Sequence, residues 1–202
     1  MKLGIVCFTA RGRALSEIVA DGLAKSKQAE LIFWDKSERA LKTFVADHFH
    51  WLDGFIFIGA IGIAVRITTP LLESKAKDPA VVVLDEEGRY VIPVLSGHLG
   101  GANALARDLS ALIGAEPVIT TSTDVHGVFA VDLWSQKLGC EILEVDRIKS
   151  ISGSLLASEP VGLFSDFEIM GKIPEGLKIP EGLETPEGLE IHAGMTPAEL
   201  GS

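Results

Sequence analysis

Short apolar runs alternate with longer segments of helical periodicity through most of the chain. The predicted strands are residues 3–8, 30–34, 53–58, 80–84, 89–94, 117–120 and 141–145. The predicted helices are residues 14–24, 38–49, 63–72, 128–138 and a segment that ends near Ile113. Apolar strands without polar interruption, joined by helices, are typical of a parallel sheet covered on both faces. We therefore expect an α/β domain over residues 1–145, with a mostly parallel sheet and helices on both faces.

Two local signals refine this pattern. Residues 85–88, Asp-Glu-Glu-Gly, form a hairpin-like turn between two of the strands. Pro70 strains the end of its helix, so we expect that helix to stop near Thr69.

The composition changes after residue 145, and residues 146–202 are expected to form a small α+β extension. A helix is predicted over residues 146–157 and a strand over residues 161–164. The tetrapeptide Pro-Glu-Gly-Leu then occurs three times with a period of six, beginning at Pro174. Proline and glycine at this spacing favour successive β-turns, and three copies are too few for a solenoid. We interpret the repeat as a linker or a sheet edge without chemistry, followed by a frayed tail.

The first glycine segment (residues 59–66) reads Gly-Ala-Ile-Gly-Ile-Ala-Val-Arg and follows an apolar strand. Glycine lets backbone N–H groups approach a ligand closely, and a helix start favours an anion. Gly59, Gly62 and Arg66 are therefore candidate substrate-binding residues. The alternative is a tight turn that only packs a strand against a helix. The spacing matches neither a dinucleotide fingerprint nor a phosphate-binding loop with Gly-Lys-Ser/Thr.

The second glycine segment (residues 96–103) reads Ser-Gly-His-Leu-Gly-Gly-Ala-Asn and also follows a strand. His98 titrates near neutral pH, which makes it a candidate acid or base, although a lone loop histidine can equally be structural. The candidate binding residues of this segment are Ser96, Gly100, Gly101 and Asn103.

Three further positions complete the candidate set. Lys75 is a candidate partner for a substrate carboxylate, or an ordinary surface charge. Thr121 and Asp124 lie in a hydroxyl-rich stretch that either faces a ligand or caps the next helix. No set of cysteine and histidine residues with the spacing of a metal site is present, so no metal is expected.

Composition narrows the classes of partner. The net charge of −10 disfavours duplex nucleic acid and an anionic membrane, although local cations and amides can still bind a small anion. The start of the chain lacks the apolar stretch of a signal peptide, and no run is long enough to span a membrane. We expect a cytoplasmic protein.

Residues 59–106, 117–132 and 148–166 resemble the cobalamin biosynthesis family CbiG, the cobalt-precorrin-5A hydrolases. The resemblance extends over most of residues 1–174. It implies hydrolytic opening of the substrate's δ-lactone in the anaerobic pathway, with release of acetaldehyde to give cobalt-precorrin-5B. It implies no cofactor, because the substrate carries the cobalt. Family members usually have a further C-terminal domain, so a separate chain of that kind is a possible partner.

These expectations combine into one hypothesis. Both glycine segments line a shared cradle for a carboxylate-fringed macrocycle. His98 acts as the base, with Asp124 or Asp85 orienting it. Amides of the glycines at 59, 62, 100 and 101 stabilise the oxyanion. A non-catalytic corrinoid-binding module and a nucleotide binder are the alternatives.

Overall fold

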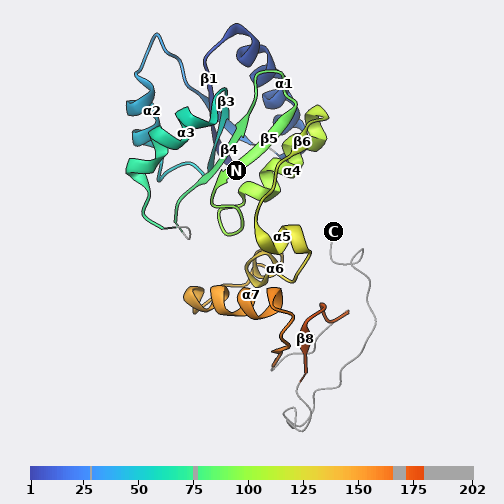
Figure 1. Cartoon of the computed structure of the whole chain (residues 1–202). Coiled ribbons are helices and arrows are strands. Elements are labelled where there is room, and N and C mark those ends of the chain that lie inside the picture. Colours follow the sequence, from blue (N-terminus) through green and yellow to red (C-terminus); the bar gives the residue numbers. More distant parts are fainter. Residues whose placement is uncertain (28, 75–76, 166–171, 180–202) are drawn as a thin grey trace. The chain divides into compact units, whose positions relative to one another are not determined.

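The computed structural model describes residues 1–27, 29–74, 77–165 and 172–179. The chain divides into two compact units, Met1–Thr121 and Ser122–Ser202 (Figure 1). The sequence placed the boundary later, after residue 145.

The first unit is built on a six-stranded sheet with the order β2-β1-β3-β4-β5-β6. The strands are β1 (Lys2–Cys7), β2 (Glu30–Phe33), β3 (Gly54–Ile58), β4 (Ala80–Leu84), β5 (Tyr90–Leu95) and β6 (Glu116–Pro117). All neighbouring pairs are parallel except β4 and β5, which are antiparallel. The predicted α/β class with a mostly parallel sheet is confirmed.

Helices cover both faces of this sheet (Figure 1). The helices are α1 (Ala10–Lys27), α2 (Leu41–His48), α3 (Ile61–Thr68) and α4 (Ala102–Ile113). Val19 of α1 and Leu105 of α4 belong to one buried cluster, whereas Phe44 of α2 and Ala64 of α3 belong to the other. Strand residues alternate between the clusters, because successive side chains point to opposite faces. This is why the central strands are apolar at every position.

Pro70 ends α3 close to the expected residue, and a 3₁₀ turn follows the helix. The α-helix stops at Thr68, and a 3₁₀ turn, η1 (Thr69–Leu71), carries the proline at its start. Proline has no N–H to donate and its ring clashes with a preceding α-helical turn, so it is tolerated where the helix changes type. The start differs from prediction: α3 begins at Ile61, within the first glycine segment.

The second unit is mainly helical in its described part. It contains α5 (Ser122–His126), α6 (Val131–Leu138), η2 (Val145–Arg147), α7 (Ile148–Leu156) and the short parallel strands β7 (Val161–Gly162) and β8 (Leu177–Lys178). The strand predicted over residues 141–145 is wrong, because that stretch is irregular up to η2.

The first repeat copy forms a turn that leads into β8. Leu177 donates its N–H to the carbonyl of Pro174 at 3.2 Å, and Gly176 has φ +88°. A residue with positive φ at this position of a turn is favoured to be glycine. The other two copies lie outside the described residues, so the prediction of successive turns is tested only at the first.

Candidate functional site

The two glycine segments lie at opposite edges of the sheet. Gly59 follows the carboxyl end of β3 and donates its N–H to Leu84, the last residue of β4, at 2.9 Å. The second glycine segment follows Leu95, which pairs with Val81 near the amino end of β4. The two segments therefore leave the sheet at opposite ends of its strands, whereas the predicted shared cradle needs them at the same end.

The strand order points to the edge that carries the first glycine segment. The chain passes from β1 to β2 on one side, then crosses to β3 on the other side of β1. Such a reversal is a topological switch point, where open α/β sheets bind ligands beyond the carboxyl ends of their strands. We call this location the β1/β3 edge. It is bounded by the residues that follow β1 and those that follow β3.

Gly59 is required by packing at this edge. Its φ is +151°, and a Cβ atom there would lie 2.9 Å from the ring of Phe8, the residue that follows β1. Phe8 is 38% exposed, and its ring packs against Trp34 with ring centroids 5.5 Å apart. Because the Gly59 amide is bonded to β4, it is not a donor for a substrate oxyanion. Glycine at position 59 is therefore explained by the turn from β3 into α3 beside Phe8, and not by binding of an oxyanion.

Gly62 has no comparable structural requirement. It lies in the first turn of α3, its φ is not in the left-handed region, and no atom lies within 4 Å of the position of an added Cβ. The Ala60 side chain cannot cap α3, and the N–H groups of Ile61 and Gly62 have no acceptor within the helix. Arg66 is exposed four residues later on the same helix face.

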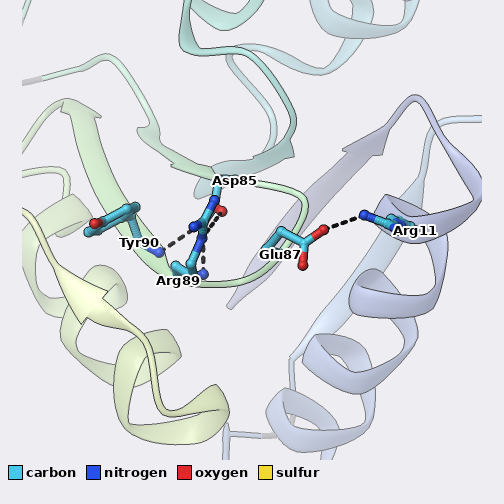
Figure 2. Close-up of polar contacts among 5 residues, drawn as sticks. All are labelled: Arg11, Asp85, Glu87, Arg89 and Tyr90. Carbon is cyan, nitrogen blue, oxygen red and sulfur yellow. Dashed lines mark hydrogen bonds and ion pairs between the residues drawn. The ribbon is translucent and has the colours of Figure 1, made fainter.

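A charged network adjoins this edge at the turn between β4 and β5 (Figure 2). Arg11, in the first turn of α1, forms an ion pair with Glu87 of that turn. The Asp85 carboxylate accepts the N–H groups of Arg89 and Tyr90, each at 2.8 Å. Burial raises the pKa of Asp85, but these hydrogen bonds outweigh it and hold the pKa below its ordinary value. Asp85 therefore holds the turn, and it lies at the opposite edge from His98, so it cannot orient that base.

Replacing Asp85 with Asn should cost about 1 kcal/mol of unfolding free energy at pH 7, since two charge-assisted hydrogen bonds become neutral ones. The lowered pKa means that the carboxylate stabilises the fold above the pKa of the unfolded chain and loses this effect as pH falls through the folded value. Urea unfolding at pH 7 and at pH 3 checks this. A difference between wild type and Asp85→Asn that fails to shrink at pH 3 would contradict the assignment.

The second glycine segment is a compact loop closed by its own backbone. Ser96 accepts the N–H of Ala102 at 3.0 Å, Gly97 that of Asn103 at 2.9 Å, and His98 that of Gly101 at 2.8 Å. The Gly101 amide is thus not a donor for an oxyanion. A Cβ at Gly100 would lie 2.3 Å from the Cβ of Ser96. Internal packing thus requires glycine at position 100, whereas glycine at position 101 is favoured by its backbone φ of +81°.

The remaining predicted residues are distributed as follows. Asn103 is 1% exposed and donates to Thr121 Oγ1 at 2.6 Å, so these two join the start of α4 to the end of the first unit. Ser96 has φ +56°, a strained value for a residue other than glycine. Asp124 lies in α5 of the second unit, and Lys75 lies outside the described residues.

Among the residues that the structure describes, no three histidine, cysteine, aspartate or glutamate side chains gather as metal ligands. None of the described helices has the length and apolar character needed to cross a bilayer.

Sequence reasoning missed Phe8 and Arg11, which the fold brings to the β1/β3 edge. Phe8 was predicted as the last residue of a strand and Arg11 as part of the loop after it, because nothing local in the sequence reveals which strands are neighbours. The available signal was the position after an apolar first strand, which in an α/β sheet always lies at the carboxyl edge.

Comparison with known proteins places this fold in a family. Residues 43–124 match the family model of the cobalamin synthesis G N-terminal domain, and residues 129–190 match that of the cobalamin biosynthesis central region. The chain belongs to the CbiG family. The resemblance noted in the sequence is thereby confirmed.

The relatives of this CbiG chain have consistent names. The cobalt-precorrin-5A hydrolase of Salmonella typhimurium is 38% identical over 184 residues, which are 85% of this chain and 50% of that protein. The one from Priestia megaterium is 41% identical, over 56% of this chain and 30% of that protein. A probable cobalt-precorrin-5A hydrolase from Methanocaldococcus jannaschii is 31% identical, over 79% of this chain and 47% of that protein. The chain spans half or less of the length of each.

A solved structure supports the fold. The crystal structure of a putative cobalamin biosynthesis protein G homolog from Sulfolobus solfataricus aligns with a TM-score of 0.55 at 26% identity. The alignment covers 88% of this chain and 52% of that one.

Proposed function

We propose that this chain takes part in cobalamin biosynthesis as the N-terminal and central regions of a cobalt-precorrin-5A hydrolase. Its reaction would open the lactone of cobalt-precorrin-5A with water and release acetaldehyde, giving cobalt-precorrin-5B. The observation that carries the proposal is the 38% identity to the Salmonella typhimurium hydrolase, maintained over 85% of the chain. The β1/β3 edge supports it, because this is where a sheet of this order binds a small ligand.

The described residues suggest how the substrate is held. Carboxylates on the rim of the macrocycle are suitable partners for a guanidinium, and Arg66 forms no ion pair within the described part of the chain. Ile61 and Gly62 lie in the first turn of α3, where backbone N–H groups have no acceptor within the helix. They are candidates for stabilising the carbonyl oxygen as charge develops during lactone opening.

This position of the substrate conflicts with the sequence-based prediction that His98 acts as the base. His98 follows β5, whose carboxyl end pairs with the amino end of β4, away from a lactone held beside Gly62. For a substrate at the β1/β3 edge, His98→Ala should release acetaldehyde within about threefold of the unmutated rate. Loss of a general base lowers a rate by roughly 10²–10⁴-fold. A loss of that size in a folded variant would indicate that the substrate binds at the second glycine segment instead.

The reaction itself is tested by assaying acetaldehyde released from cobalt-precorrin-5A. Because the relatives are longer, the assay has two arms: the purified chain alone, and the chain with the C-terminal half of the Salmonella typhimurium relative added in trans. Release in either arm supports the proposal. Release in neither arm, while the intact relative is active under the same conditions, contradicts it. A dependence on the second arm would show that a further domain is a required partner.

A further inference from the structure

The exposed side of α3 has an unusual composition for a short amphipathic helix. Ala64 and Thr68 are buried against the sheet. Two rows of residues spaced four apart are exposed: Ile61 and Val65 flank the buried side, and Gly62 and Arg66 lie opposite it. Ile61 is 44% exposed and Val65 is 42% exposed. A solvent-facing helix surface is ordinarily polar, so this surface has the composition of a contact site.

Gly62 is the least expected of these residues. Glycine weakens a helix by about 1 kcal/mol relative to alanine, and here neither φ nor a neighbouring atom requires it. A glycine in an exposed helical position gives a flat spot at which another molecule can approach the backbone. The isopropyl group of Val65 lies beside that spot on the next turn.

Arg66 adds a charge to the same surface. Helical side chains lean toward the N-terminus of their helix, so the guanidinium lies over the turn that contains Gly62. That direction is also toward the β1/β3 edge, where Phe8 is exposed. The apolar and cationic features are therefore continuous with the site described above.

We propose that the α3 surface, made of Ile61, Gly62, Val65 and Arg66, is the contact surface for the macrocycle ring. The ring lies on the two aliphatic side chains and over Gly62, and one rim carboxylate pairs with Arg66. This inference takes one thing from the proposed function, namely that the ligand is a carboxylate-bearing tetrapyrrole. A planar apolar ring with an anionic rim complements a flat aliphatic surface that ends in one arginine, on a chain whose net charge of −10 otherwise repels anions.

The test compares two corrin probes by spectroscopic titration. Cobyrinic acid has free rim carboxylates, whereas cobinamide has the same ring with its side chains amidated. Arg66→Gln should weaken cobyrinic acid at least tenfold and leave cobinamide within twofold, since it removes only the charge-assisted pair. Val65→Thr should weaken both probes by a few fold, because it makes the ring contact polar.

Gly62→Ala is the decisive variant. It should weaken both probes about tenfold because a methyl group lifts the ring from the helix, yet it should not lower the unfolding temperature. Gly153 of α7 is the matched control, since it is also helical, exposed and free of neighbours within 4 Å. Gly153→Ala should leave binding of both probes unchanged.

Several results would overturn this inference. Unchanged affinity in Gly62→Ala and Arg66→Gln would do so, as would equal losses for both probes in Arg66→Gln. Self-association of the chain that Val65→Arg abolishes would show that a second copy covers this surface instead. If the affinities do not change but acetaldehyde is still released, the proposed reaction is supported and only the role of the α3 surface is contradicted. If the affinities change as expected but no acetaldehyde is released, only the proposed reaction is contradicted.

Discussion

Gly100→Ala is expected to destabilise the first unit by roughly 3 kcal/mol. The added Cβ would lie 2.3 Å from the Cβ of Ser96, 3.0 Å from the Ser96 carbonyl oxygen and 3.1 Å from that of Asp78. Two of these neighbours are backbone atoms in segments held by hydrogen bonds, so the clash cannot be relieved by turning one side chain. Urea unfolding followed by circular dichroism measures the loss.

The adjacent Gly101→Ala is the control for this variant. Gly101 has φ +81°, but no atom lies within 4 Å of the position of its Cβ. Its replacement therefore tests backbone strain alone, about 1 kcal/mol. Equal effects of the two variants would contradict the conclusion that close packing, and not ligand access, requires glycine at position 100.

Phe55→Ala is expected to cost about 3–5 kcal/mol. Phe55 is fully buried in β3, and its ring stacks on Phe49 at 6.1 Å and meets Phe44 edge-on at 6.5 Å. Removing the ring leaves a cavity beneath the strand that leads to Gly59. Thermal unfolding should show a drop of about 10 °C or more.

Phe33→Ala provides the comparison on an edge strand. Phe33 ends β2 and is 46% exposed, so less apolar area is lost when its ring is removed. A cost of about 1 kcal/mol is expected. A larger loss for Phe33→Ala than for Phe55→Ala would show that the core is not centred on β3.

The elements of the first unit were largely predictable, because each has a local cause. The apolar run Phe55–Ile58 required burial on both faces, and Pro70 required a change of helix type. The glycine-rich start of α4 was visible because only glycine adopts the backbone of Gly101 without strain.

The relative placement of the two glycine segments was derived incorrectly from information that the sequence contained. The turn at residues 85–88 is too short to join parallel strands, which need a crossover of a dozen or more residues. It therefore reverses β5, and the end of that strand at Leu95 comes to the opposite edge from Gly59. The hairpin was recognised, but its consequence for the site was not.

Other features depend on distant residues and have no local signal. Gly100 is fixed by the backbone of Asp78, and Gly59 by the ring of Phe8. The order of β2, β1 and β3, which defines the β1/β3 edge, follows from how the crossovers pack against the sheet. Such long-range packing is not encoded in hydrophobic periodicity.

The location of the substrate is tested most directly by nuclear magnetic resonance with a cobalt(II) corrinoid. Unpaired electrons on cobalt broaden the amide signals of nearby residues, and the diamagnetic cobalt(III) form serves as the reference. The account predicts strong broadening of the amides of Ile61, Gly62 and Arg66, with little change at His98 and Gly100. Broadening centred on residues 96–103, with the amides of residues 59–66 unaffected, would contradict it.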